Sequence, residues 1–352
     1  MLSAPEQMTT LRLNGHFLSQ TLSGTPKLLV EKMGAIQAQD FAMAKWALGI
    51  RLSGCTNQTI TEACNRGEIL RTHILRPTWH FVSPANIRWM LSLTAGKIKS
   101  SSKSRDRDLG ITEELYERTN RIIRKALEGN KCLTKDALAL EIGKAKIKND
   151  TPHITHFLMR AEAEGIICSG VLDKNAHTYA LLEERVPSVP ALPKEEALAQ
   201  LVRIYFTTRA PATLQDFCWW SNLSLTEAEK GLNAVKPEFF PEKIGGQTYW
   251  IPNSYNLEES SDNVFLLPAF DEYIISYRDR SAALLLETQS KAISSNGVFR
   301  PTIVAKGKVI GLWKKITSGR RAVAFDFFNQ PDEVIKKALD KSIENYHAFW
   351  KA

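Results

Sequence analysis

Two glutamines separated by one alanine, Gln37-Ala38-Gln39, are the residues of this chain whose type and spacing best suit a chemical role. A glutamine amide cannot remove a proton at neutral pH, but it can accept a hydrogen bond from a water molecule and so orient it. Two such amides on one face position a water without acting as a strong base. That suffices for hydrolysis when the leaving group is already activated.

The backbone around the glutamines must be extended or turned for them to share a face, because helical residues two apart point about 200° from each other. The neighbouring residues permit this arrangement. Gly34 can end a preceding helix, and Asp40 is a favourable N-cap for a helix that starts at Phe41. We therefore expect both amides in a connector just ahead of a helix N-terminus. Glutamines in such a place also serve as simple caps or lining residues.

A second candidate segment ends the tract from Ile69 to Val82, about thirty residues after the glutamines. Its last residues, Thr78-Trp79-His80-Phe81-Val82, alternate in the manner of a half-buried strand. A single histidine in such a strand is commonly a hydrogen-bonded structural residue, so His80 has a core interpretation beside any chemical one.

The two segments together resemble the AlkZ-like family of winged-helix DNA glycosylases, whose members carry Gln-Φ-Gln (Φ is an apolar residue) where most glycosylases carry a carboxylate. The resemblance implies that Gln37 and Gln39 position the attacking water, with no cofactor and no metal. The family's Thr-Φ-His element matches Thr78-Trp79-His80, which implies that Thr78 and His80 orient water or the sugar of the damaged nucleotide. The family also has a Gln-Φ-Asp branch with broader action on alkylated bases or crosslinks. This chain has the motif of the Gln-Φ-Gln branch, which is tied to natural-product resistance, although Asp40 supplies a nearby carboxylate.

The resemblance also implies a class of substrate. A purine alkylated at N7 or N3 is cationic, so its glycosidic bond breaks with little acid catalysis. The enzyme then needs mainly to stabilise the sugar oxocarbenium and to place a water. Bulky adducts and interstrand crosslinks at these positions share this chemistry, whereas neutral lesions such as uracil would be excluded.

Further likeness to the family's last domain lies in the C-terminal half, in Leu266-Leu267-Pro268-Ala269-Phe270-Asp271-Glu272-Tyr273, in Tyr277-Arg278-Asp279-Arg280, and in Asn296 to Pro301 with Gly307 to Trp313. We interpret Asp271, Asp279 and Arg280 as ion-pairing residues that hold the structure together, in preference to catalytic groups. Trp219-Trp220 and Phe239-Phe240 have the spacing of core residues and not of base-stacking platforms.

The charge of the chain suits a polyanionic partner, with a net charge of +8 and a pI near 9.1. Residues 97–148 hold fourteen Lys/Arg and eight Asp/Glu. Such a surplus is typical either of a solvated helical hairpin or of a face that neutralises phosphates. The predicted contacts to duplex DNA there are Lys97, Lys99, Lys103, Arg105 and Arg107. Arg71 and Arg76 suit either phosphate contacts or ion pairs with Asp40.

Several classes of protein do not fit the sequence. No run approaches the ~18 to 20 apolar residues of a membrane span, and no P-loop, HExxH or GxSxG motif is present. The five cysteines are scattered without CxxC spacing, which disfavours a disulfide framework and a zinc site. The N-terminus has no signal-peptide pattern. We expect a monomer without membrane contact, cytoplasmic and associated with the nucleoid when bound to DNA.

The fold predicted from these patterns is α+β, with tandem winged-helix units and a small C-terminal β-rich domain. Three helices followed by a β-hairpin, the winged-helix order, recur in residues 111–186 and 194–252, on either side of a proline-rich linker. Thr134 is a predicted helix cap in the first of these units, and Ser224 and Glu227 form a predicted capping box in the second. Residues 1–110 are predicted to form a more helical unit of the same kind, with helices at 9–19, 26–33, 41–52 and 60–65. Residues 253–352 are predicted to hold short strands at 264–267, 282–286, 302–305, 309–313 and 322–328, closed by a helix.

Two other functions remain alternatives. In a non-enzymatic winged-helix regulator the glutamines would be structural, but a regulator commonly reads a palindrome as a dimer. Three different units in one chain argue against such two-fold recognition. An RNA-binding module is the weaker alternative, because the expected single-strand stacking residues are not evident.

Overall fold

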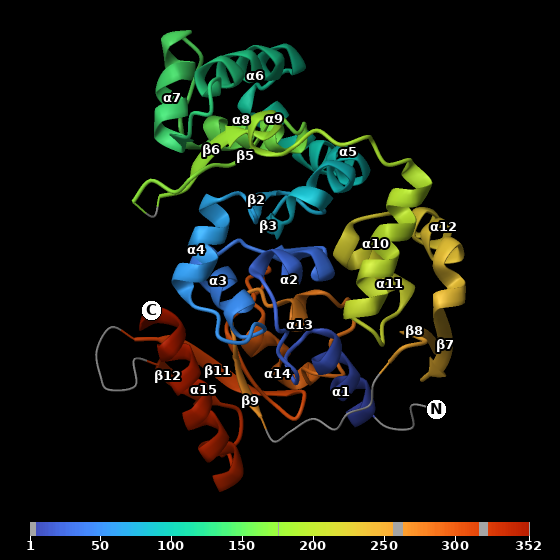
Figure 1. The fold of residues 1–352 in the computed structure, drawn as a ribbon. Helices are drawn as coiled ribbons and strands as arrows, with labels where there is room; N and C mark the ends of the chain where they lie inside the picture. The colour runs from blue at the N-terminus through green and yellow to red at the C-terminus, as the bar shows by residue number, and fades with distance from the viewer. Residues whose placement is uncertain (1–4, 175, 256–262, 317–322, 352) are drawn as a thin grey trace. The chain divides into compact units, whose positions relative to one another are not determined.

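The computed structural model describes residues 5–174, 176–255, 263–316 and 323–351. The chain divides into two compact units, here called the large unit (residues 1–61 and 198–352) and the small unit (residues 62–197). Helices and small antiparallel sheets occur in both, which makes the protein a mixed α+β structure (Figure 1). The boundary at residue 61 falls inside the predicted first domain, residues 1–110. Elsewhere the two units are larger than the predicted domains, and the boundaries of the four domains stay a prediction.

The small unit begins with the hairpin of β2 (Leu70–His73) and β3 (Trp79–Val82), in which Thr72 lies opposite His80. The predicted strand at 78–82 is therefore confirmed. Helix α5 (Pro84–Leu109) follows and was not predicted. The buried positions in the second half of α5 include the polar residues Ser102 and Asp106. This part of the helix therefore lacks the regular spacing of apolar residues that predicts a helix from sequence.

The rest of the small unit has the predicted order of three helices and a hairpin, with one short strand added. The elements are α6 (Glu113–Leu127), β4 (Leu133–Thr134), α7 (Lys135–Lys144), α8 (Thr151–Ala163), β5 (Ile167–Ser169), β6 (Thr178–Leu181) and α9 (Leu182–Arg185). The strands form an antiparallel sheet in the order β4-β6-β5. Ile123, Phe157 and Leu181 lie in one core between these helices and the sheet. Thr134 caps α7, as predicted, and Asp150 caps α8.

The second run of three helices and a hairpin lies in the large unit. Its elements are α10 (Lys194–Thr208), α11 (Leu214–Ser221), α12 (Leu225–Val235), the 3-10 turn η1 (Lys236–Glu238), β7 (Phe239–Ile244) and β8 (Gln247–Pro252). The predicted capping box of Ser224 and Glu227 is present at α12. The hairpin turns at Gly245 and Gly246, whose φ values of 58° and 80° favour glycine.

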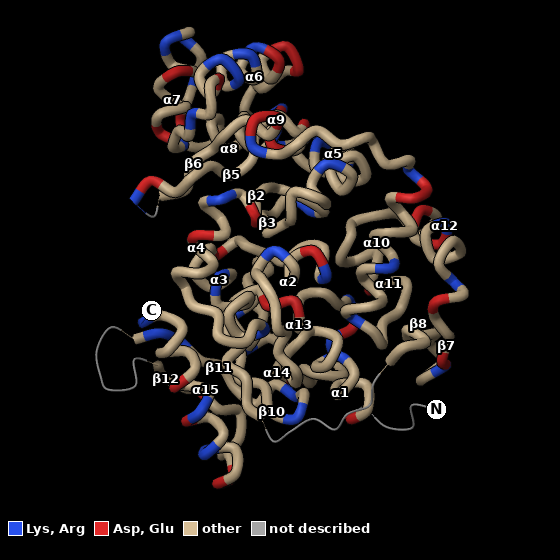
Figure 2. The backbone as a smooth tube through the Cα atoms, in the orientation of Figure 1, with Lys and Arg blue, Asp and Glu red and all other residues tan. Residues whose placement is uncertain are grey.

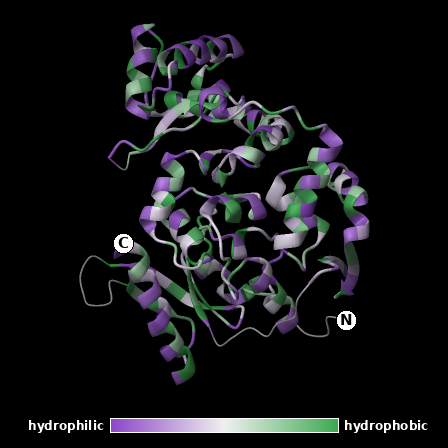
Figure 3. Cartoon of the chain, in the orientation of Figure 1, coloured by the Kyte–Doolittle hydropathy of each residue, from purple (hydrophilic) through white to green (hydrophobic). Residues whose placement is uncertain are grey.

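The C-terminal part of the large unit contains a four-stranded antiparallel sheet, ordered β12-β11-β10-β9. The strands are β9 (Val264–Leu267), β10 (Thr302–Ala305), β11 (Lys308–Lys315) and β12 (Val323–Phe327). Their central residues are largely hydrophobic (Figure 3). Helix α15 (Glu333–Lys351) packs on β9 (Figure 1). Its Tyr346 ring lies 5.1 Å from that of Trp313 in β11.

One predicted strand in this region is wrong. Residues 281–284 form a turn and a bend, and Leu286 begins helix α14 (Leu286–Ala292). Ala283 and Leu284 are nevertheless buried in the core, so an apolar run reflects core packing of a turn and not a strand. Ala322, the first residue of the last predicted strand, lies outside the described residues.

The N-terminal elements of the large unit are α1 (Pro5–Gly15), α2 (Pro26–Met33), β1 (Ala35–Gln37), α3 (Phe41–Gly49) and α4 (Asn57–Asn65), the last of which crosses the unit boundary. All four predicted helices are present, although α3 ends three residues before the predicted Leu52. Across the described ranges, no helix combines the length and apolar character needed to cross a bilayer.

Candidate functional site

The glutamine motif lies in a connector between α2 and α3. Gly34 ends α2 with a φ of 76°, and a Cβ on it would lie 2.8 Å from Ile204 Cγ2. Asp40 then caps α3 by accepting a hydrogen bond from the Met43 backbone N–H at 3.0 Å. Both glutamines are therefore outside the helices and directly ahead of a helix N-terminus, which confirms the backbone arrangement that the sequence predicts.

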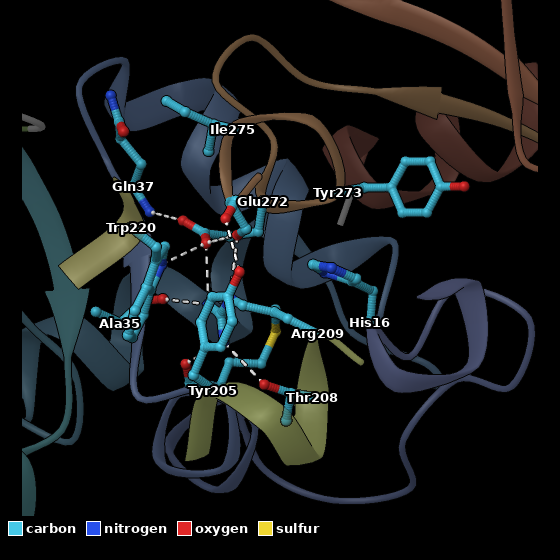
Figure 4. A network of polar contacts seen from close by, with 12 residues as sticks. His16, Ala35, Gln37, Tyr205, Thr208, Arg209, Trp220, Glu272, Tyr273 and Ile275 are labelled. Atoms are coloured by element: carbon cyan, nitrogen blue, oxygen red, sulfur yellow. Dashed lines mark hydrogen bonds and ion pairs between the residues drawn. The ribbon is translucent and has the colours of Figure 1, made fainter. Parts of the chain in front are cut away.

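The two glutamines differ in exposure. Gln37 ends β1 and is 5% exposed, whereas Gln39 lies in the bend before α3 and is exposed. The side chain of Gln37 points away from the network of buried polar groups around its backbone (Figure 4). The backbone N–H of Gln37 thus faces the network, and the side-chain amide points in another direction. That the two amides share one water stays a prediction.

A buried carboxylate holds the backbone of Gln37. Glu272, the first residue of α13 (Glu272–Ile275), is 1% exposed and accepts the Gln37 backbone N–H at 2.8 Å through Oε1. Its other oxygen, Oε2, accepts hydrogen bonds from Arg209, Trp220 Nε1 and Ser276 Oγ at 2.9, 3.0 and 2.6 Å (Figure 4). Four N–H and O–H donors thus point at the two oxygens of this carboxylate.

The guanidinium of Arg209 completes this network. Its side chain is 0% exposed and donates to the carbonyl oxygens of Met33 at 3.0 Å and Ala35 at 3.1 Å. It also donates to Ser276 Oγ, Thr208 Oγ1 and Glu272 Oε2. These five hydrogen bonds equal the five N–H donors of an arginine, so the guanidinium is fully satisfied. The carbonyl of Met33 at the end of α2, and the Ala35 carbonyl and Gln37 N–H of β1, are thereby held by one ion pair.

A second buried ion pair lies beside the first. Asp271 binds Arg51 through two hydrogen bonds of 2.7 and 2.9 Å, and both side chains are 1% exposed. Arg51 also donates to the carbonyl oxygens of His16 and Ala47. This confirms the predicted structural role of Asp271. Burial, and then the nearby Arg209, Arg51 and Arg12 charges, hold the pKa of His16 well below its usual value, so this imidazole is neutral.

Thr78 and His80 belong to the small unit. His80 is 0% exposed, and its Nδ1 lies 2.9 Å from the backbone oxygen of Thr78. Burial and this local contact fit the core interpretation of His80 and leave its catalytic role a prediction. Thr78 is half-buried and immediately precedes β3. The four predicted catalytic residues are therefore divided, with the glutamines in the large unit.

Arg71 is buried in the small unit, with its guanidinium 3.4 Å from the ring centre of Trp79. The His177 ring also packs on Trp79, with the two ring centres 4.8 Å apart. Such stacking holds Arg71 in place through cation–π attraction. Arg76 is half-buried. Phosphate contact by either arginine stays a prediction.

The remaining predicted DNA contacts all lie on the second half of α5. Lys97, Lys103, Arg105 and Arg107 are exposed, and Lys99 is half-buried. Lys99, Lys103 and Arg107 recur every four residues and so share one side of the helix. The bridges of Lys99 to Glu164 at 3.9 Å and of Arg105 to Asp108 at 3.7 Å are solvent-exposed, and such pairs exchange readily for phosphate. Figure 2 places further Lys and Arg along α6.

Other kinds of chemistry have little support among the described residues. No group of three or more His, Cys, Asp or Glu there is placed to hold a metal ion. The five cysteines are free, and burial raises the pKa of the Cys168 thiol to about 12. A thiol of that pKa is a poor nucleophile at neutral pH.

Sequence reasoning missed the residues that hold the motif. Glu272 was noted only within an apolar tract, Trp220 was interpreted as core, and Arg209 was not singled out. The available signal was two acids, Asp271-Glu272, directly after an apolar tract, since buried acids require buried bases.

Comparison with known proteins places this chain in a described family. The family model for AlkZ-like DNA glycosylases matches residues 30–349. An interstrand DNA cross-link repair glycosylase from Streptomyces sahachiroi is 20% identical over 332 residues, covering 89% of this chain and 88% of that protein. The solved structure of the Streptomyces sahachiroi DNA glycosylase AlkZ superposes with a TM-score of 0.83 at 18% identity, covering 99% of this chain and 97% of that one. At that identity, the superposition shows a shared fold.

Proposed function

The chain belongs to the AlkZ-like family of DNA glycosylases, and we propose that it releases cationic N7- or N3-alkylated purines from duplex DNA with a glutamine-positioned water. The observation that carries the proposal is the placement of Gln37 and Gln39. Both lie in non-helical backbone at the N-terminus of α3, with amides in place of the usual carboxylate.

The reaction follows from the charge of the substrate. Alkylation leaves a positive charge on the purine, so the bond from C1′ to the base nitrogen breaks with its electron pair moving onto the base, which leaves neutral. The sugar becomes an oxocarbenium ion. Water then forms a bond to C1′ and loses a proton to solvent. Neither step needs a protonated side chain at the base.

The glutamines suit these reaction steps because they add no charge and supply hydrogen-bond acceptors. An amide oxygen accepts a hydrogen bond from the water and directs its lone pair toward C1′. Thr78 and His80 are proposed to orient the water or the sugar. Asp40, the nearby carboxylate, already accepts the Met43 N–H as helix cap, which disfavours it as the base. A site without a general acid also rejects neutral lesions such as uracil.

DNA binding is proposed to occur through the phosphate backbone. Lys99, which is half-buried, and the exposed Lys103 and Arg107 lie on one side of α5. The exposed Lys97 and Arg105 flank them. We assign residues 111–186 and 194–252 as winged-helix units of a monomer, and residues 1–110 as a third, more helical unit of the same kind. The order of helices and hairpin in the first two supports this assignment.

The principal alternative is a non-enzymatic regulator, and α8 argues against it. In a winged helix, this third helix is the one that reads base edges. Its polar residues are here bound within the small unit, His156 to Asp106 of α5 and Arg160 to Glu113 and Glu164. The exposed residues of α8 are Thr151, Pro152 and Thr155, which carry no charge and no amide. Recognition by lesion fits such a helix better than recognition by sequence.

The wider substrate range is a further part of the proposal. One relative is named an interstrand DNA cross-link repair glycosylase. Crosslinks and bulky adducts at purine N7 make the base cationic in the same way, so the chemistry that releases a simple alkylated purine also unhooks them. Full base flipping is not required for such substrates, because a leaving group that is already activated needs less enclosure.

The experiment that separates enzyme from regulator compares duplexes that differ only in one base. The intact protein is incubated with a duplex containing one N7-methylguanine, with its undamaged twin, and with a crosslinked duplex. The proposal predicts release of free base from the damaged duplexes, and binding to the undamaged duplex that does not depend on its sequence. Tight binding to one undamaged sequence without base release from any duplex would support the regulator.

A further inference from the structure

We infer that the buried Arg209–Glu272 pair is the positioning element of the glutamine motif, an inference that rests on the proposed function. Both residues belong to the large unit, as does Gln37. Arg209 lies 172 residues after Gln37 in the chain, and Glu272 lies 235 residues after it. Both side chains are buried, at 0% and 1% exposed, so their effect on the reaction is exerted through the backbone that leads into Gln37.

The contacts fall on both sides of the peptide groups that lead into Gln37. Arg209 holds the carbonyl oxygens of Met33 and Ala35, and Glu272 holds the N–H of Gln37. The guanidinium and carboxylate also bind each other at 2.9 Å. The ion pair therefore fixes the backbone at both ends of β1, Arg209 at its start and Glu272 at its end. The Gln37 side chain emerges from the opposite side (Figure 4).

Stability alone does not explain a charged pair at this place. Replacing a buried ion pair by well-packed apolar residues is often neutral or stabilising. An apolar core would, however, leave the buried carbonyls and N–H of this short strand without partners, and it would not define their orientation. The pair thus gives a specific backbone geometry, which is what a pair of amides needs to place one water within a few tenths of an ångström.

The chain contains a matched control for this inference. Arg51–Asp271 is a second buried pair in the same unit, with hydrogen bonds of 2.7 and 2.9 Å against 2.9 Å for Arg209–Glu272 and similarly low exposure. Its carbonyl contacts are to His16 and Ala47, which lie outside the glutamine segment. Equivalent damage to the two pairs should therefore have similar effects on stability and different effects on base release.

The test replaces each arginine by lysine in the full chain. A lysine has three donors on one nitrogen and cannot reproduce the five-bond fork. Base release from the N7-methylguanine duplex is measured in a single turnover at saturating enzyme, with the duplex Kd measured separately. Arg209→Lys should lower the rate about 100-fold, with Kd unchanged. Arg51→Lys should retain the rate at comparable thermal stability. Equal losses in both variants, or none in either, would overturn the inference.

A milder variant covers the case in which Arg209→Lys does not fold. Ser276→Ala removes the hydroxyl that donates to Glu272 at 2.6 Å and accepts from Arg209 at 3.0 Å, while both charges remain. It should lower the single-turnover rate in the same direction by a smaller factor and leave Kd unchanged. A wild-type rate in Ser276→Ala, with Arg209→Lys unfolded, would count against the pair as a positioning element.

Two controls separate this inference from the proposed function. If Gln37→Ala releases base at the wild-type rate, the glutamine-positioned water of the proposed function fails. Hydrogen exchange at the Gln37 backbone N–H still tests the pair in that case, because Arg209→Lys should accelerate exchange there and Arg51→Lys should not. If Gln37→Ala loses activity while Arg209→Lys and Ser276→Ala keep it, the inference alone fails.

Discussion

Neutralising Glu272 should be far more costly to the large unit than neutralising a surface glutamate. Glu272→Gln keeps the shape of the side chain but places an NH₂ group against N–H donors and leaves the Arg209 guanidinium, which is 0% exposed, without its counter-charge. Breaking a buried pair in this way costs about 3–5 kcal/mol. Such a loss changes the ratio of folded to unfolded protein by more than about a hundredfold.

The control for this prediction is Glu238→Gln. Glu238 binds Arg203 through two 2.7 Å hydrogen bonds in the same unit, but the two side chains are 43% and 46% exposed. An exposed pair is worth at most about 1 kcal/mol. Urea denaturation followed by tryptophan fluorescence measures both losses. Equal losses in the two variants, or a loss under about 1 kcal/mol for Glu272→Gln, would refute the reasoning that burial makes this pair energetically distinct.

Three further predictions concern pH, salt and substrate. Burial, with smaller contributions from the Arg71 and His73 charges, lowers the pKa of His177 to about 3, so the unfolded chain takes up a proton near pH 6.5 while the folded small unit does not. Its contribution to stability is full above pH 6.5 and falls as the pH drops toward 3, and denaturation of His177→Phe across that range should show a flatter dependence; the same slope in both proteins contradicts this. Lys103→Ala should reduce the slope of log Kd against log salt for duplex DNA by about 1, whereas Lys336→Ala, on α15, should leave it unchanged; a slope unaltered by Lys103→Ala removes that lysine from the DNA-contacting face. A duplex with uracil should yield no free base under conditions that release N7-methylguanine, and efficient uracil release would show a general acid that the proposed chemistry lacks.

Local chemistry made the surroundings of the glutamines predictable. Gly34 and Asp40 are strong signals for a helix end and a helix start, and the structure uses both as expected. The capping box at Ser224 and the hairpin glycines after Ile244 are of the same kind. In each case a few adjacent residues determine the backbone, so sequence patterns are sufficient.

Longer-range organisation was not predictable in this way. The hydrogen bond from Gln37 to Glu272 joins residues 235 positions apart, and no local pattern specifies such a partner. Helix α5 was missed because Ser102 and Asp106 occupy buried positions where a helix pattern leads one to expect apolar residues. The turn at Ala283 and Leu284 was mistaken for a strand because core burial and β-pairing select similar residues.

The measurement that tests the central claim most directly is the rate of N7-methylguanine release by the wild type and by the Gln37→Ala, Gln39→Ala double variant. Duplex affinity is measured alongside for both proteins. The proposed mechanism predicts release by the wild type, a loss of about a hundredfold or more in the double variant, and equal affinity for DNA. Equal rates of release from the two proteins would contradict the role of the glutamines in placing the water.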